Sequence, residues 1–113
     1  MPSPNSAGVP IQTVVFMAKS MQRILEDERE GETASQRMKQ LAVMMVIYTM
    51  QTDGEPVTVT NICKKFHAPR QVVVDVMKML VERGLITYRT EAHGRAKGRV
   101  YVYSLTPRGA GTD

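Results

Sequence analysis

Residues 73–107 read VVDVMKMLVERGLITYRTEAHGRAKGRVYVYSLTP, and this stretch carries most of the information about the fold. Apolar residues recur at helical spacing as far as Leu80, and Gly84 can adopt the left-handed conformation that ends a helix. Runs rich in β-branched and aromatic residues follow at 85–90 and 99–105, separated by a segment that contains glycine. The stretch therefore predicts a helix followed by a two-stranded antiparallel hairpin.

The tip of the predicted hairpin is strongly basic, since Arg95, Lys97 and Arg99 alternate along it. Residues 58–113 carry ten basic and four acidic side chains, a balance of +6 (10 − 4), whereas residues 1–57 carry five and seven, a balance of −2 (5 − 7). A positive half indicates a polyanion such as nucleic acid as its partner. A surface kept basic for solubility would give the same imbalance, and so charge alone does not distinguish a nucleic-acid-binding surface from a merely soluble one.

The size and composition are those of one globular domain: 113 residues, of which 42% are hydrophobic and 23% charged. No apolar run approaches the roughly 18 residues that a membrane span needs, and the N-terminus lacks the pattern of a signal peptide. Cys63 is the only cysteine, so no internal disulfide can form. We therefore expect an intracellular, cytoplasmic protein.

The N-terminal part predicts an arm followed by a helix. Residues 1–10 are rich in Pro, Ser, Gly and Asn, which is typical of a flexible arm. From Ile11 to about Arg29, apolar residues recur at helical spacing and predict a helix. The acidic run 26–32 opposes the dipole at the C-terminal end of this helix, and so we expect an exposed, frayed helix end there.

A second helix is predicted between a capping box and a glycine turn. Thr33 and Gln36 fit the box, and Asp53 and Gly54 supply the turn after about Gln51. The apolar residues of this helix form two stripes on nearly opposite faces, one made of Met38, Leu41, Ala42, Met45 and Tyr48 and the other of Val43, Val46, Ile47 and Met50.

A helix that is apolar on both faces must be covered on both. The hairpin region can cover only one face, and the other cover must come from the N-terminal helix, a second subunit or both. We therefore expect a homodimer. The expected interface consists of Ile11, Val14, Val15, Ala18, Leu25, Val43, Val46, Ile47 and Met50.

The middle of the chain predicts a short strand at 57–59 and a short helix through Phe66, capped by Thr58 or Thr60. Pro69 fits the start of the next helix, where its missing amide proton costs least. The buried stripe of that helix is expected to be Val73, Val76, Met77 and Leu80.

These elements follow the order helix, short strand, helix, turn, helix and hairpin. With the words ERGLI at 82–86 and SLTPRG at 104–109, the chain resembles bacterial winged helix-turn-helix transcription regulators, most closely the MarR type. The resemblance covers residues 33–109, preceded by the arm and the extra N-terminal helix (11–32) and followed by a short tail (110–113). It implies a mainly α fold with a small β-hairpin, in the α+β class.

The resemblance also implies a function, that of a sequence-specific DNA-binding regulator of transcription, a repressor that acts as a homodimer. The segment 69–83 corresponds to the recognition helix and 93–98 to the tip of the wing. A recognition helix places its first residues near base edges in the major groove, and a wing lies on phosphates or in the minor groove. The residues expected to contact double-stranded DNA are Lys64, Lys65, Arg70, Gln71, Val74, Asp75, Lys78, Arg89, Arg95, Lys97 and Arg99.

The chain departs from the family in two ways. Family members usually carry long dimer-forming helices after the wing, whereas this chain ends at Asp113, and so the dimer is expected to use residues 11–51. The outward face of the predicted recognition helix holds Asp75 and Glu82, where family members usually place Ser, Thr, Arg or Gln. A protein-interaction module, such as an adaptor or anti-activator with little specific DNA binding, therefore stays open as an alternative.

The sequence contains no nucleophile elbow, P-loop, dinucleotide fingerprint or Ser/His/Asp pattern, and we do not expect an enzyme. Cys63 and His67 share a helical face, and His93 lies in the predicted wing, but these are too few ligands for structural zinc. We expect no metal and no cofactor. Tyr101 and Tyr103 share one face of the last strand and are expected to cover the core of the hairpin, with base stacking as the alternative.

Overall fold

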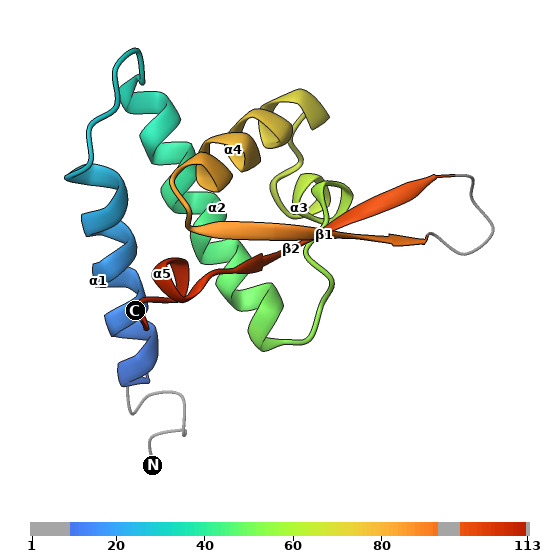
Figure 1. Cartoon of the computed structure of the whole chain (residues 1–113), viewed down its shortest axis with the longest axis horizontal. Helices are drawn as coiled ribbons and strands as arrows, with labels where there is room; N and C mark the ends of the chain where they lie inside the picture. Colours follow the sequence, from blue (N-terminus) through green and yellow to red (C-terminus); the bar gives the residue numbers. More distant parts are fainter. Residues whose placement is uncertain (1–9, 93–97, 113) are drawn as a thin grey trace.

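The computed structural model describes residues 10–92 and 98–112. Its elements are α1 (Ile11–Leu25), α2 (Ala34–Thr52), α3 (Val59–Phe66), α4 (Arg70–Glu82), β1 (Ile86–Ala92), β2 (Arg99–Leu105) and α5 (Pro107–Ala110), shown in Figure 1. The two strands form an antiparallel sheet, with Ile86 opposite Leu105 and Ala92 opposite Arg99. The predicted class, mainly helical with a two-stranded hairpin, is confirmed.

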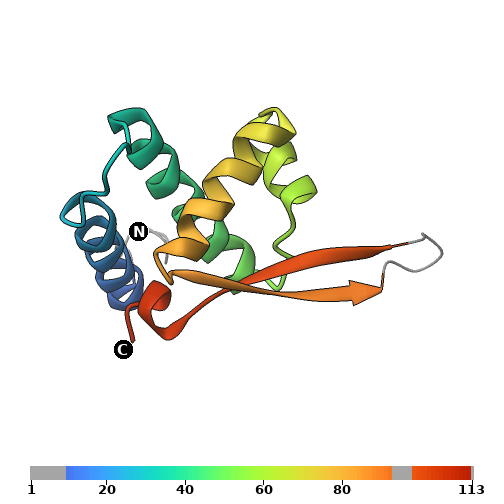
Figure 2. The ribbon, with the colours of Figure 1, turned by 45° about the horizontal axis from the view of Figure 1, so that its top comes forward.

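Helix α2 lies at the centre of the molecule and contacts α1, α3, α4 and β2. Helix α1 lies on one side of α2, and α3 and α4 lie on the other (Figure 1). The hairpin starts beneath α4 and projects away from α1 past the helices (Figure 2). In the outer parts of the strands, residues 89–92, Arg99 and Tyr101 are exposed, whereas Val102 is buried.

The hydrophobic core lies between α2 and the elements packed around it. The predicted stripe of α4 belongs to this core, because Val73, Val76, Met77 and Leu80 are all buried. On the other side of α2, the ring of Phe16 stacks on that of Tyr48 with the ring centroids 4.3 Å apart. The other buried apolar residues of this cluster are Ile24, Val43, Met44, Ile47, Met50, Val57, Val59, Ile62, Leu85 and Ile86.

The predicted local signals define the starts of α2 and α3 and the end of α4. The hydroxyl of Thr33 accepts from the amide of Gln36 at 3.1 Å, and the side chain of Gln36 accepts from the amide of Thr33 at 2.8 Å, which completes the capping box. Thr58 is the residue that caps α3. After α4, Gly84 has a φ of +74°, which a residue with a side chain rarely adopts, and so it ends the helix at little cost.

The C-terminal turn is held tightly against the start of β1. The Thr106 hydroxyl caps α5 by accepting from the amide of Gly109 at 3.0 Å, and it donates to the Gly84 carbonyl at 2.6 Å. A Cβ atom on Gly109 would lie only 1.8 Å from the carbonyl oxygen of Leu85, so only glycine fits there. Helix α5 also contacts α1, which connects the two ends of the described chain.

Two expectations about the elements need correction. Helix α1 ends at Leu25 rather than near Arg29, because the acidic residues that follow form a loop with a buried partner. The segment 57–59 is not a strand, since Val59 already begins α3, although the carbonyl of Val57 accepts from the amide of Tyr103 at 2.8 Å.

The second apolar stripe of α2 is covered within the chain. Val43, Ile47 and Met50, expected at a dimer interface, are at most 4% exposed, and Val46 is half-buried. Their neighbours in the core come from α1, α3 and α4. The three buried positions therefore offer no surface to a second subunit.

Candidate nucleic-acid interface

The outward face of α4 begins with two polar residues directly after Pro69. Arg70 and Gln71 are both exposed, and the guanidinium of Arg70 makes one long contact, donating to the Thr60 hydroxyl at 3.4 Å. The Gln71 amide donates to the carboxylate of Asp75, one turn further on, at 2.8 Å. Gln71 and Asp75 therefore form one hydrogen-bonded unit on the surface of the helix.

The same face continues through Lys78 and Glu82, which are exposed because spacings of three and four residues keep them opposite the buried stripe. Val74 lies on the flank of this face and is half-buried. The face thus combines one lysine with two carboxylates, and its positive end is the N-terminal one. The predicted contacts Arg70, Gln71, Val74, Asp75 and Lys78 do lie on adjoining parts of one helix.

The strand register sorts the hairpin residues between two faces. Tyr88 pairs with Tyr103 and Thr90 pairs with Tyr101, and because side chains alternate along a strand, Arg99 lies on the same face as these four residues. The guanidinium of Arg99 donates to the hydroxyl of Thr90 at 3.5 Å. This face of the hairpin is consequently aromatic near the helices and basic further out.

The three tyrosines form a cluster on that face. The ring centroid of Tyr88 lies 5.0 Å from that of Tyr101 and 5.8 Å from that of Tyr103. Tyr103 packs against the core, as expected, whereas Tyr88 and Tyr101 keep about half of their surface exposed (50% and 52%). The half-exposed rings and their hydroxyl groups are available to a partner.

A groove of about 370 Å³ separates this hairpin face from α4. Arg70, Val74 and Lys78 line it from the helix, opposite the tyrosines. Burial, and then the neighbouring Tyr101 and Tyr88, raise the pKa of Tyr103 above its ordinary value, and the charge of Arg70 opposes this shift. The Arg70 charge is thus close enough to act on the hairpin, and the two elements form one surface.

The structure places one expected contact, Arg89, on another face and pairs a second, Lys65, with a carboxylate. Arg89 pairs with Val102 in the register and therefore lies on the opposite face of the hairpin, where it binds Glu91 at 3.1 Å. At the end of α3, Lys65 binds Glu55 at 2.9 Å, while its neighbour Lys64 is exposed. The expected contacts Arg95 and Lys97, together with His93, lie outside the described residues.

Sequence reasoning missed a buried arginine at the end of α4. The side chain of Arg83 is 1% exposed. Its Nε donates to the side chain of Gln40 at 2.8 Å, and Nη1 donates to the backbone carbonyls of Arg23 at 3.1 Å and Asp27 at 2.9 Å. Nη1 also reaches the carboxylate of Asp27 at 3.2 Å, and Nη2 binds Glu32.

This network gives a role to two residues of the acidic run that was expected to be an exposed helix end, while Glu26, Glu28 and Glu30 are exposed as expected. A buried charge is tolerated when it is paired and its donors are satisfied, and Glu32 and Asp27 supply that pairing for Arg83. Gln40 completes it by donating to Glu32 at 2.8 Å. The network fastens the loop after α1 to the C-terminal end of α4. The only signal in the sequence was the excess of five carboxylates over one cation, Arg29, in residues 26–32.

The outer face of α1 is a second exposed surface. Helix α1 turns Phe16, Ser20 and Ile24 towards the core, whereas the predicted apolar stripe faces outward, with Ile11 76% exposed. The apolar residues of this outer face are Ile11, Val14, Val15, Met17, Ala18, Met21 and Leu25. A continuous apolar face on one helix is unusual on a monomer.

Comparison with known proteins gives no match to a protein-family model, a curated protein or a solved structure. In residues 10–92 and 98–112, no helix combines the length and apolar character needed to cross a membrane. Among the same residues, His, Cys, Asp and Glu form no group of three that could hold a metal ion. Cys63 is half-buried, and His67 is exposed in the turn between α3 and α4, where its φ is +53°.

Proposed function

We propose that this protein is a winged helix-turn-helix regulator of transcription that binds specific DNA sites as a homodimer. In this proposal α3 and α4 form the helix-turn-helix, α4 is the recognition helix and the β1–β2 hairpin is the wing. The observation that carries the proposal is that Arg70 and Lys78 of α4 line one groove with three tyrosines of the hairpin, whose face also carries Arg99. Both elements of DNA recognition thereby meet on one side of the molecule.

The first turn of α4 has the chemistry needed to read base edges. Arg70 can bind guanine through two parallel hydrogen bonds, because its one contact to Thr60 is long and exposed. Gln71 donates one amide proton to Asp75. Its second amide proton and its carbonyl oxygen remain available as the donor and acceptor that bind adenine. Val74 can contact a thymine methyl group, and Asp75 can accept from cytosine.

The hairpin supplies contacts to the phosphate backbone. Arg99 and the hydroxyl groups of Tyr88 and Tyr101 lie on the face that is turned to α4, and Lys78 completes that surface from the helix. Arginine, lysine and tyrosine are ordinary phosphate ligands, and such contacts hold a recognition helix in register. Phosphate binding also makes affinity fall as the salt concentration rises.

The apolar outer face of α1 supports the homodimer. Two copies that bury this face against each other across a two-fold axis would remove the exposed Ile11 and its neighbours from water. A two-fold dimer presents two recognition helices to successive major grooves and therefore requires a pseudo-palindromic site. On this proposal α1, rather than the buried stripe of α2, carries the interface.

A protein-interaction module is the second candidate. Asp75 and Glu82 are exposed on the outward face of α4, and carboxylates at that position repel phosphate. Apolar grooves flank the same helix, and a protein partner could fill them. This candidate predicts a stable protein complex and only weak DNA binding that does not depend on sequence.

The deciding experiment is fluorescence anisotropy with duplexes from the region upstream of the protein's own gene, at physiological salt. We expect one duplex to bind at least about a thousandfold more tightly than its scrambled counterpart. Equal and weak binding of all duplexes would contradict the proposal and favour the interaction module. Competitor DNA in every sample keeps non-specific retention from imitating a site.

The dimer is tested separately by sedimentation equilibrium at micromolar concentration. The unmodified protein is expected to be a dimer, and Val14→Glu is expected to be a monomer, because the change buries a charge in the proposed interface. Gln12→Glu adds the same charge at the flank of the apolar face and serves as the control. A monomeric unmodified protein would refute the assignment of α1 as the interface.

A further inference from the structure

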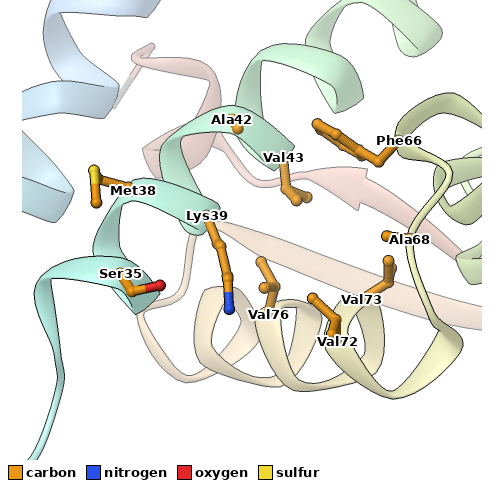
Figure 3. Close-up of a pocket in the computed structure, with 10 residues that line it drawn as sticks. All are labelled: Ser35, Met38, Lys39, Ala42, Val43, Phe66, Ala68, Val72, Val73 and Val76. Carbon is orange, nitrogen blue, oxygen red and sulfur yellow. The ribbon is translucent and has the colours of Figure 1, made fainter.

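A second groove lies on the flank of α4 that faces away from the hairpin, between α2, the end of α3 and α4 (Figure 3). Its volume is about 430 Å³, within the usual range for small-molecule sites. Its walls are almost entirely aliphatic, and they include Met38 and Ala42 from α2 and Val72 and Val76 from α4. None of these residues belongs to the surface assigned to DNA.

The apolar walls of this groove are left open to water. Met38 is 64% exposed at one end of the groove, and Phe66 is 37% exposed at the other. Figure 3 shows the ring of Phe66 reaching from the end of α3 towards Val43, which forms the floor of the groove with Val73. Apolar surface in this arrangement is removed from water only when a further molecule fills the groove.

The polar atoms of the groove lie together at one place. The Lys39 side chain extends from α2 across to α4 beside Val76, with the Ser35 hydroxyl one turn earlier on the same helix (Figure 3). Within the described part of the chain, no ion pair engages Lys39. An unpaired ammonium above an apolar trough is complementary to a molecule with one anionic end and an aliphatic body.

We propose that this groove binds medium-chain fatty acids, that is, aliphatic monocarboxylates with on the order of ten non-hydrogen atoms. The carboxylate accepts hydrogen bonds from Lys39 and Ser35, and the chain lies over Met38, Ala42 and Val72. A second carboxylate is disfavoured, because it would meet either the aliphatic walls or Asp75, which lines the adjoining groove. An acyl ester lacks the charge that Lys39 recognises.

A fatty acid in the groove is also expected to change the affinity for DNA, and this part of the inference rests on the proposed function. Val72, Val73 and Val76 line the groove from the helix that carries Gln71 and Asp75 on its outward face. A fatty acid that wedges between α2 and α4 shifts the helix that reads DNA. Coupling between two binding sites is reciprocal, so DNA must then change the affinity for the fatty acid by the same factor.

The probes for the test are octanoate and methyl octanoate, which share the aliphatic chain and differ in charge. Methyl NMR signals of Ala42, Val72 and Val76 are followed during titration of the full chain with each probe. We expect octanoate to shift these signals and to bind more tightly than the ester. Lys39→Met should weaken octanoate about fivefold, the effect of losing an exposed ion pair, and leave the ester unchanged.

Two further variants make the test specific to the groove. Lys64→Met removes a lysine on the opposite side of α3 from Phe66 and outside the groove, and should leave octanoate affinity unchanged. Ala42→Phe fills the groove from an exposed helix position and should abolish binding. Circular dichroism and thermal unfolding of each variant separate loss of the site from loss of the fold.

Three results would overturn the proposal: groove signals that do not respond to octanoate, equal octanoate affinity in Lys39→Met, or groove signals that respond only to protein concentration. The last would mean that a second copy of the chain covers the groove. If octanoate binds and DNA affinity does not change, the coupling is refuted and the site stands. If no DNA binds at all, the proposed function fails, while the methyl signals still decide whether the groove binds fatty acids.

Discussion

Arg70 and Arg83 stand at the two ends of α4 and have opposite environments. Arg70 is exposed and, among the described residues, its side chain makes one hydrogen bond, to Thr60. Arg83 is buried and donates to side chains and carbonyls from α1, α2 and the loop between them. The same functional group therefore maintains the fold at one end and is free for a partner at the other. Counting positive charges along the chain cannot distinguish these two uses.

The largest expected effect lies at Arg83. Arg83→Met removes the charge but keeps the apolar stem, and so leaves the buried carboxylate of Glu32 without its cationic partner, with only the hydrogen bond from Gln40. Breaking a buried ion pair from one side typically costs about 3–5 kcal/mol, and we expect a loss of this size in the free energy of unfolding. Urea denaturation at a fixed protein concentration measures it.

The matched control is Arg70→Met, which should change the free energy of unfolding by no more than about 0.5 kcal/mol. A double variant, Arg83→Met with Glu32→Gln, should recover part of the loss, because it no longer buries an unpaired carboxylate. Equal urea midpoints for the two single variants would show that the Arg83 network contributes nothing to stability. The contrast between the two ends of α4 would then disappear.

The residues at the two ends also show what a sequence can predict. The capping box at Thr33, the stripe around Val76 and the left-handed Gly84 are local patterns, and the structure has all three. The partners of Arg83 lie 43 to 60 residues away in the chain, and no local pattern links them to it. The end of α1 was placed too late for the same reason, since the loop after it is bound by that distant residue.

The prediction of a strand at 57–59 was wrong for a different reason. β-branched residues favour a strand, but Thr58 caps a helix that begins at the next residue, and the cap prevails. The faces of the hairpin were also beyond prediction, because they depend on strand register. A shift of the pairing by one residue would place Arg89 opposite Tyr101 or Tyr103 and therefore on the same face as Arg99.

A smaller effect is expected at Arg70, and in DNA affinity rather than stability. Arg70→Ala should weaken binding to the preferred duplex by about 1–3 kcal/mol, roughly 5- to 150-fold, if the guanidinium reads a base. Arg70→Lys keeps the charge and loses the paired hydrogen bonds, so it should lose affinity for the preferred duplex but not for a scrambled one. Anisotropy titrations with both duplexes measure the difference.

The result for Arg70→Lys determines what kind of contact Arg70 makes. If Arg70→Lys bound the preferred duplex as tightly as the unmodified protein does, Arg70 would bind phosphate only. Specificity would then have to come from Gln71 and Asp75 or from the shape of the DNA. The comparison between the ends of α4 would remain, but Arg70 would position the protein rather than select the sequence.

The smallest expected effect separates the two faces of the hairpin. Arg99 lies on the face turned to α4, whereas Arg89 lies on the other face and binds Glu91. If Arg99 contacts one phosphate, Arg99→Ala should reduce the slope of log affinity against log salt concentration by about 0.9, and Arg89→Ala should leave the slope unchanged. Titrations at four salt concentrations are sufficient to measure both slopes. Equal changes for the two variants would contradict the register argument, because DNA would then contact both faces of the hairpin.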